Sequence, residues 1–468
     1  MMRSPMMRNM MKRYTIAILT FLLAIPFQAI RAESSTGKIL SLPECLELAR
    51  QNNRTLQNAV LDIQAASEQK SEAYTKYYPS ISANVIAFQA FDKIIKGDGT
   101  YPQEIMMLGE QFAQMVGHPF SYKELNKGYS TTLSAVQPLY AGGQIKAGNK
   151  LATIQQDVLT LQRQLTEKEV LQHVTECYWQ IAILKYNLST IEAAEKQIEA
   201  VKKDVEQYVK SGVTTRNALL QVNLRQQELA SNRLKVENAD HVLRMLLAQQ
   251  IGCSSEREDD LIDIDASAVE AIDPHNVYVS PQEAAIRREE LQMAHFGVNV
   301  QKLQLQMERG KNLPSLAVGL MGYNTGFGGL SKNVKNNART NMTNGLVFGT
   351  LSVPISSWWG GSHAIRRQKI RLQQSLNQII DAQEQLRIDI ESAWSNLVEA
   401  YKQIQIAEAS VEEAAENLRM STDQYRAGSE TISDLLDAET LNRKAQDQLS
   451  QAKVTYQIRL ADYQRKTR

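Results

Sequence analysis

Cysteine, histidine and aromatic residues are scarce in this sequence, and their scarcity excludes several kinds of site. The 468 residues include three cysteines, which lie far apart and form neither a disulfide framework nor a metal-binding spacing. The six histidines are scattered, and no two have the spacing of metal ligands. A nucleophile–base pattern and a phosphate-binding loop are also missing. The sequence therefore predicts no enzyme, no catalytic residue, no cofactor and no metal site.

Excess charge and long apolar runs are lacking as well. The chain has 52 Lys and Arg against 51 Asp and Glu, whereas a broad nucleic-acid surface needs excess positive charge, so no nucleic-acid partner is expected. Beyond the N-terminal region, no apolar run approaches the roughly 20 residues of a membrane-spanning helix. Aromatic residues make up 6% of the chain, and Ala, Gln, Glu and Leu dominate long stretches, which is typical of extended helices.

The N-terminal residues 1–32 are predicted to be an export signal peptide. A basic start that includes Arg3 and Arg13 precedes a short apolar core, Tyr14 to Ile25. Ala32 follows as a plausible cleavage point, and the alternative is an uncleaved membrane anchor. We therefore expect an exported protein.

The remaining sequence contains an internal repeat of about half its length. Pro79-Ser80-Ile81 recurs as Pro314-Ser315-Leu316, and other matches are Pro138 with Pro354, Gly142-Gly143 with Gly360-Gly361, and Gly212 with Gly428. We therefore divide the chain into a first repeat at residues 38–255, a polar connector at 256–279 and a second repeat at 280–468.

Each repeat is expected to contain a lead-in helix, two strands and a very long helical hairpin. The lead-in helices are expected at Pro43 to Tyr77 and Pro281 to Lys311, and the hairpins at 144–251 and 362–466. Apolar residues in the hairpins alternate steps of four and three, from Val170 in one copy and from Leu386 in the other. Helices of roughly 100 Å exceed any ordinary globular core, so they must pack against other long helices.

Four segments with period-two alternation are predicted to be strands, at about 79–91, 128–140, 314–327 and 345–356. Each is about as long as a tilted transmembrane strand, but four strands cannot close a barrel, and open edges are costly in lipid. Chains would then have to share one barrel. Two chains would give eight strands with no room for a channel, and three would give twelve. The alternative is a pair of β-hairpins capping a helical bundle in water.

The tip sequence from Tyr425 through Gly428 to Asp434 and Asp437 completes a pattern that resembles the TolC-like outer-membrane efflux proteins. The resemblance also rests on the duplicated hairpins, the Pro-Ser strand entries and the Gly-Gly after the second strand, and it covers about Leu42 to Arg465. It implies a homotrimer with a shared twelve-stranded transmembrane β-barrel in the outer membrane and a twelve-helix α-barrel extending into the periplasm. It also implies two partners, a periplasmic adaptor (membrane fusion) protein and an inner-membrane transporter.

The resemblance further places a periplasmic gate at Tyr425, Glu430, Asp434 and Asp437, with the aspartates forming a carboxylate ring that attracts cations. The two aspartates could alternatively be helix-start acids favoured by the helix dipole. Glu430 and Ala218 replace a basic residue and an acidic partner of the family, so the closed gate must be latched differently. The expected adaptor-contact tips are Gly212, Val213, Thr214, Thr215, Gly428, Ser429, Glu430 and Thr431.

The predicted function is therefore the outer-membrane exit channel of a tripartite efflux or type I secretion system. A periplasmic coiled-coil adaptor or structural protein is the alternative, but an adaptor should carry a lipoyl-like β-rich module, which we do not find.

Overall fold

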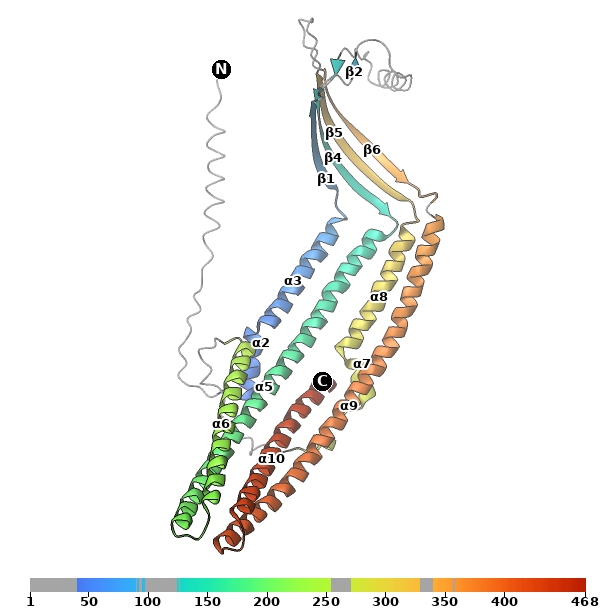
Figure 1. Ribbon diagram of the computed structural model, residues 1–468. Coiled ribbons are helices and arrows are strands. Elements are labelled where there is room, and N and C mark those ends of the chain that lie inside the picture. Colours follow the sequence, from blue (N-terminus) through green and yellow to red (C-terminus); the bar gives the residue numbers. More distant parts are fainter. Residues whose placement is uncertain are drawn as a thin grey trace.

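The computed structural model describes residues 40–89, 91, 95–96, 124–125, 127–253, 271–328, 340–356 and 358–468. The chain is highly elongated, with a sheet at one end and helices running away from it to two hairpin tips at the other (Figure 1). The expected signal peptide at residues 1–32 and residues 256–270 of the connector lie outside the described residues. The predicted fold class is confirmed: the chain is mainly helical, with duplicated long hairpins and a four-stranded antiparallel sheet.

The sheet has the strand order β1-β4-β5-β6, so the last strand of the first repeat pairs with the first strand of the second. The strands are β1 Ser80–Gln89, β4 Lys127–Ala141, β5 Ser315–Gly328 and β6 Thr340–Ser352. A pair of two-residue strands that the alternation pattern did not predict, β2 Ile95–Lys96 and β3 Glu124–Leu125, lies between β1 and β4 in sequence. Within the described residues, β1 and β6 have a strand partner on one side only.

The two faces of the sheet differ in chemistry because neighbouring residues on a strand point to opposite sides. One cross-strand row consists of apolar side chains only: Ile81, Ala135, Leu320 and Val347. Three of these are largely exposed, at 72% for Ile81, 58% for Leu320 and 78% for Val347. The next row, on the other face, consists of Ser82, Ser134, Met321 and Leu346, and the hydroxyl oxygens of its two serines lie 2.9 Å apart.

Two helices of exceptional length run from the sheet to the tips, and a shorter helix returns from each (Figure 1). They are α5 Gln144–Lys210, of 67 residues, and α9 Trp358–Arg426, of 69 residues; the return helices are α6 Arg216–Ile251 and α10 Ile432–Thr467. At 1.5 Å per residue, α5 is roughly 100 Å long. The predicted seam is the packed face, since Val174, Ile181, Ile390 and Leu397 are fully buried.

Each of the two long helices has a glycine pair near its start, but the pairs lie at different places relative to the helix. Gly142 and Gly143 adopt left-handed conformations, with φ of 59° and 77°, and α5 begins only after them. Gly360 and Gly361 instead lie inside α9, which begins at Trp358, four residues before the expected start of the second hairpin. The duplication of sequence at this point is therefore not a duplication of backbone conformation.

The lead-in segments are broken helices, where the sequence predicted continuous ones. The pieces are α2 Leu42–Asn52 and α3 Arg54–Thr75 in the first repeat, and α7 Pro281–Arg287 and α8 Glu289–Gly310 in the second. The single residues between them, Asn53 and Arg288, have extended backbones and are 235 positions apart, the offset of the repeat. The Asn53 side chain accepts hydrogen bonds from Thr55 N and Leu56 N and donates one to Gln250 O at 2.7 Å. These bonds compensate for the interrupted helix and fix its angle.

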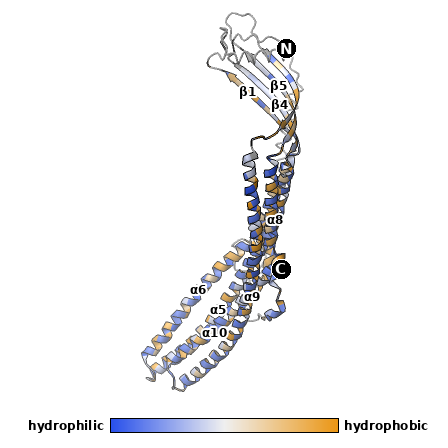
Figure 2. Cartoon of the chain, turned by 90° about the vertical axis from the view of Figure 1, so that its right-hand side faces the viewer, coloured by the Kyte–Doolittle hydropathy of each residue, from blue (hydrophilic) through white to orange (hydrophobic). Residues whose placement is uncertain are grey.

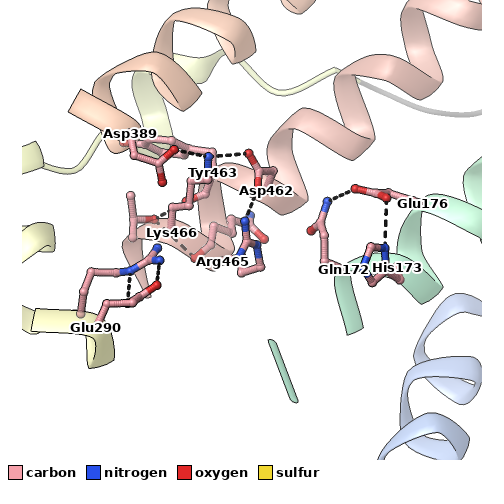
Figure 3. Close-up of polar contacts among 12 residues, drawn as sticks. Gln172, His173, Glu176, Glu290, Asp389, Asp462, Tyr463, Arg465 and Lys466 are labelled. Carbon is pink, nitrogen blue, oxygen red and sulfur yellow. Dashed lines mark hydrogen bonds and ion pairs between the residues drawn. The ribbon is translucent and has the colours of Figure 1, made fainter. Parts of the chain in front are cut away.

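Two equivalent apolar cores lie at mid-height, where the broken helices meet the hairpins. In the first repeat, Cys45 and Ala49 of α2 pack on Val174 and Ile181 of α5. In the second, Ala284 and Ala285 of α7 pack with Ile390, Leu397 and the buried tyrosines of α10. A polar cluster near this level joins α10 to α9, where Lys466 Nζ lies 2.9 Å from Asp389 Oδ1 (Figure 3).

The two repeats cross at a point with no room for side chains. A Cβ atom on Gly142, at the start of α5, would lie 2.2 Å from the carbonyl oxygen of Gly310, the last residue of α8. A Cβ atom on Gly310 would lie 2.3 Å from Gly142 O. Both positions therefore require glycine while the backbones keep this separation.

Candidate functional site at the hairpin tips

The two hairpin tips have the same backbone turn. Gly212 and Gly428 both adopt a left-handed conformation with φ of 76°. Their amides donate to the carbonyl oxygens of Val209 and Tyr425, at 3.2 and 3.0 Å. An L side chain at either glycine would be strained, so the turn explains both glycines by helix-termination chemistry. Beyond the glycines, the side chain of Val213 is 73% exposed, which leaves an apolar group at the first tip without cover.

The helices that leave the two tips are capped differently. Thr431 is the N-cap of α10, and its hydroxyl accepts a hydrogen bond from Asp434 N at 3.3 Å. Asp434 Oδ2 accepts in return from Thr431 N at 3.1 Å and from Thr431 Oγ1 at 2.7 Å, which completes a capping box. Thr215 occupies the corresponding place before α6, but its side chain makes no capping bond. The residue 216 positions before Asp434 is Ala218, which has no carboxylate to complete such a box.

The two predicted gate aspartates therefore differ. Hydrogen bonds from the Thr431 side chain and backbone hold the pKa of Asp434 below its usual value. This capping role is the structural alternative that the sequence left open for this residue. Asp437 lies one helical turn further along α10, is exposed, and has no hydrogen bond or ion pair within the described part of the chain. Both carboxylates are accessible to solvent.

The side chains of Tyr425 and Glu430 have different environments. Tyr425 is partly buried against the tip core that joins the two hairpins, whose members include Val205, Ile432 and Leu435. Burial raises the pKa of the Tyr425 phenol, and Tyr208 and Asp204 of α5 raise it further. Glu430 Oε2 is shielded from solvent but has no hydrogen-bond partner among the described residues. The tip thus holds Tyr425 against the first hairpin and leaves the Glu430 carboxylate unpaired.

A buried ion pair that the sequence analysis missed connects the hairpins near the tips. Arg225 of α6 is 7% exposed and Glu439 of α10 is 3% exposed. Arg225 Nε and one terminal nitrogen donate to Glu439 Oε2 at 3.1 and 2.8 Å, and the other nitrogen donates to Glu228 Oε2 at 2.7 Å. Burial opposes the charged form of Arg225, yet the bonds to the two carboxylates outweigh it and raise the pKa of the guanidinium.

A sequence signal for this pair was available. On α6, Arg225 continues the spacing of the buried residues Ala218, Val222 and Leu229, so a charged residue occupies a seam position. A charge at such a position requires a partner, because an unpaired buried charge is very costly. The sequence does not say which of the many acids is that partner.

Within the ranges that the structure describes, no group of three or more His, Cys, Asp and Glu residues could hold a metal ion. In the same ranges, no helix combines the length and apolarity needed to span a bilayer.

Comparisons with known proteins agree with this architecture. The family described as outer membrane efflux protein matches residues 45–249 and 280–463. A curated relative, the pyoverdine export outer membrane protein OpmQ of Pseudomonas putida, is 22% identical over 423 residues, which cover 87% of this chain and 81% of that protein.

Solved structures share the fold at low sequence identity. The CmeC outer membrane channel of Campylobacter jejuni superposes with a TM-score of 0.72 at 12% identity, covering 94% of this chain and 90% of that one. The outer membrane protein VceC of Vibrio cholerae gives a TM-score of 0.69 at 15% identity, covering 91% of this chain and 96% of that one.

Proposed function

Because the chain belongs to the outer membrane efflux protein family, we propose that three copies assemble into one continuous exit duct across the outer membrane and the periplasm. Its place in the cell is the outer membrane, from which it extends into the periplasm. In this proposal the duct receives cargo from an inner-membrane transporter through a periplasmic adaptor, in an efflux or type I secretion system.

The observation that carries the proposal is the incomplete sheet. Each chain contributes four strands, and β1 and β6 expose unpaired edges within the described residues. Unpaired backbone groups cost several kcal/mol each in lipid, so a membrane-embedded sheet must close on itself. Three copies supply twelve strands, enough for a barrel with an open interior, whereas eight strands leave an interior filled by side chains.

The two faces of the sheet support the same arrangement. The row that includes Ile81, Leu320 and Val347 offers apolar side chains to lipid on all four strands. The row behind it offers the hydroxyls of Ser82 and Ser134 to water on the strands of the first repeat and continues with Met321 and Leu346 on those of the second. Transmembrane barrels show this alternation between an apolar exterior and a polar interior. Helices then continue the wall below the membrane: α3, α5, α8 and α9 all run away from the sheet (Figure 1).

In the proposed trimer the hairpin tips form the periplasmic gate. Three copies bring Asp434 and Asp437 around one axis as a ring of carboxylates, which attracts cations. Tyr425, held against the first hairpin, and Glu430, which has an unpaired carboxylate oxygen, complete the gate in this proposal. The turn residues of both tips are proposed to contact the adaptor: Gly212, Val213, Thr214, Thr215, Gly428, Ser429, Glu430 and Thr431.

The assembly is tested on the full chain extracted from membranes in detergent. Native mass spectrometry should give a trimer, and the same preparation should form channels in planar bilayers. A stable monomer that forms no channels would overturn the proposal.

The gate is tested in the same bilayers with a trivalent cation as blocker. Replacing both aspartates, Asp434→Ala and Asp437→Ala, should raise the blocking concentration by about tenfold or more, because the ring loses its charge. A matched control is Glu199→Gln, which removes an exposed acid of the first hairpin that pairs with Lys203. Unchanged block in the double variant would place these aspartates outside the lumen while leaving the assembly itself intact.

A further inference from the structure

The sheet-proximal ends of the two long helices carry basic residues and no acid. From Gln144 to Gln156, α5 contains Lys146 and Lys150, and its first acid is Asp157. From Trp358 to Ile380, α9 contains Arg366, Arg367, Lys369 and Arg371, and its first acid is Asp381. The positive end of the helix dipole favours acids at a helix start, so helix chemistry does not account for this pattern.

A groove between α3 and α5 concentrates this charge. It has a volume of about 640 Å³ and is lined by Lys70, Lys146 and Lys150 together with Tyr74 and Tyr77. We call it the basic groove. None of the described residues that line it carries a carboxylate.

The three lysines of the basic groove are available to a ligand. Lys70 Nζ donates to Gln156 Oε1 at 3.2 Å, which places an ammonium group across the groove from α3 to α5. Lys146 and Lys150 are exposed, and neither has an acidic partner in the described parts of the chain. Asn149 Nδ2 donates to Ala73 O at 3.1 Å and so fixes the two helices at the level of the groove. The groove therefore presents three cations on a rigid frame.

The basic groove lies where strands become helices. Tyr77 stands three residues before Ser80, the first residue of β1, and Lys146 stands five residues after Ala141, the last residue of β4. Tyr74 contacts Tyr77 edge to face, with ring centroids 5.4 Å apart. Figure 2 shows strongly hydrophilic residues on the helices directly below the sheet.

Aromatic side chains mark the same level elsewhere on the chain. Trp359, at the start of α9, is 82% exposed, and Tyr78 is 57% exposed. Tyrosine and tryptophan gather where lipid meets water, because their rings are apolar and their polar atoms need a partner. If the strands span the outer membrane, this level is the phosphate layer of its periplasmic leaflet.

We propose that the basic groove binds the phosphate headgroup of an anionic phospholipid in the periplasmic leaflet of the outer membrane. The ammonium groups of Lys70, Lys146 and Lys150 pair with the phosphate oxygens, and the tyrosines border the headgroup. The proposal rests on the strands lying in the membrane, but it concerns a site that the channel function does not require. It gives the duct a fixed depth in the bilayer.

The test uses the full-length assembly in detergent, with phosphatidylglycerol and phosphatidylcholine of equal chain length as probes. Native mass spectrometry should show retained phosphatidylglycerol at least tenfold in excess of phosphatidylcholine. The variant Lys70→Gln, Lys146→Gln, Lys150→Gln should lose this preference. Equal retention of the two lipids by the wild type, or an unchanged preference in the triple variant, would overturn the proposal.

Four further arms separate the alternatives. The matched control is Lys196→Gln, Lys235→Gln, Lys402→Gln, which removes three exposed lysines from helices away from the sheet and should keep the lipid preference. The double variant Lys146→Arg, Lys150→Arg keeps the positive charge and should also keep the lipid preference. The single changes Lys146→Gln and Lys150→Gln replace the triple variant if it does not fold.

Complete displacement of the lipid by millimolar inorganic phosphate would identify a free-phosphate site and overturn the lipid assignment. Failure of the wild type to appear in the outer-membrane fraction would count against the channel function instead.

Discussion

At the scale of single residues, one carboxylate at the tip of the second hairpin has two roles. Asp434 closes the capping box of α10 through Thr431, and it is also one of the acids proposed to ring the lumen. The hydrogen bonds that cap the helix favour the ionised form, so they keep Asp434 charged at a lower pH than an ordinary aspartate. Capping and cation attraction are therefore compatible, and the first supports the second.

The change Thr431→Val tests this coupling. It removes the hydroxyl donor but keeps the backbone amide, so the pKa of Asp434 should rise toward its ordinary value of 3.8. Cation block should then be lost at a higher pH than in the wild type as the solution is acidified, which bilayer recordings between pH 3 and pH 6 can measure.

The sign of the accompanying stability change follows from linkage. A lowered folded-state pKa contributes stability above the ordinary value, and this contribution disappears as the pH falls through the folded-state pKa. Thr431→Val should therefore weaken the pH dependence of unfolding in this acidic range. Thr215→Val is the matched control, because Thr215 occupies the same N-cap position in α6 without a side-chain capping bond. An equal shift of block in both variants would contradict the coupling.

At the scale of elements, the two hairpins of one chain are joined near the tips by apolar packing and by the pair of Arg225 with Glu439. The apolar part of this contact brings Ala218 and Val222 of α6 together with Ile432 and Leu435 of α10. Apolar packing tolerates small sliding movements, whereas a buried ion pair fixes one register. The pair therefore determines how the two tips of one copy sit relative to each other.

Removing one partner of this pair should be costly. Glu439→Ala leaves Arg225 buried without its main carboxylate, and we expect a loss of about 3 kcal/mol in the free energy of unfolding. Glu228→Ala is the matched control: Glu228 also bonds Arg225, but its side chain is 56% exposed, so its removal should cost less than about 1 kcal/mol. Chemical unfolding followed by circular dichroism in detergent measures both, and equal losses would show that Glu439 does not hold the register.

Sequence periodicity predicted the long hairpins because a seam of apolar residues is repeated over many turns, as from Val170 to Tyr208. It did not predict the breaks at Asn53 and Arg288, since a single extended residue leaves the helical spacing on either side nearly unchanged. The pairing of Arg225 with Glu439 could not be predicted from the sequence either. These residues are 214 positions apart, and only the packed hairpins bring them together. At the tips, the glycine turns could be predicted from the sequence. That Asp434 caps α10 whereas the Asp437 side chain makes no hydrogen bond among the described residues could be seen only in the hydrogen-bond geometry of the structure.

At the scale of the whole molecule, the sheet determines which surface meets lipid. The row of Ile81, Ala135, Leu320 and Val347 is apolar across all four strands. A charge introduced in this row would therefore interrupt a continuous apolar surface. The neighbouring row, with Ser134 beside Met321, faces the other way.

The change Leu320→Arg should therefore hinder assembly into the membrane, since a lipid-facing arginine costs about 2–4 kcal/mol at mid-bilayer. Ser134→Arg, on the opposite face, is the matched control and should assemble while altering the ion selectivity of the channel. The amount of trimer in outer-membrane fractions measures the first effect, and reversal potentials in bilayers measure the second. Normal assembly of Leu320→Arg together with failure of Ser134→Arg would reverse the assignment of the faces.

The glycine crossing of the two repeats has a consequence for replacing one half of the chain with the other. The first repeat carries Thr75 at the position that Gly310 occupies in the second, 235 residues later. A tandem of two identical first halves would place the threonine side chain where only 2.3 Å separates a Cβ from the carbonyl of Gly142. Two copies of the first half could therefore not cross as closely as Gly142 and Gly310 do, so the first half cannot replace the second at this contact.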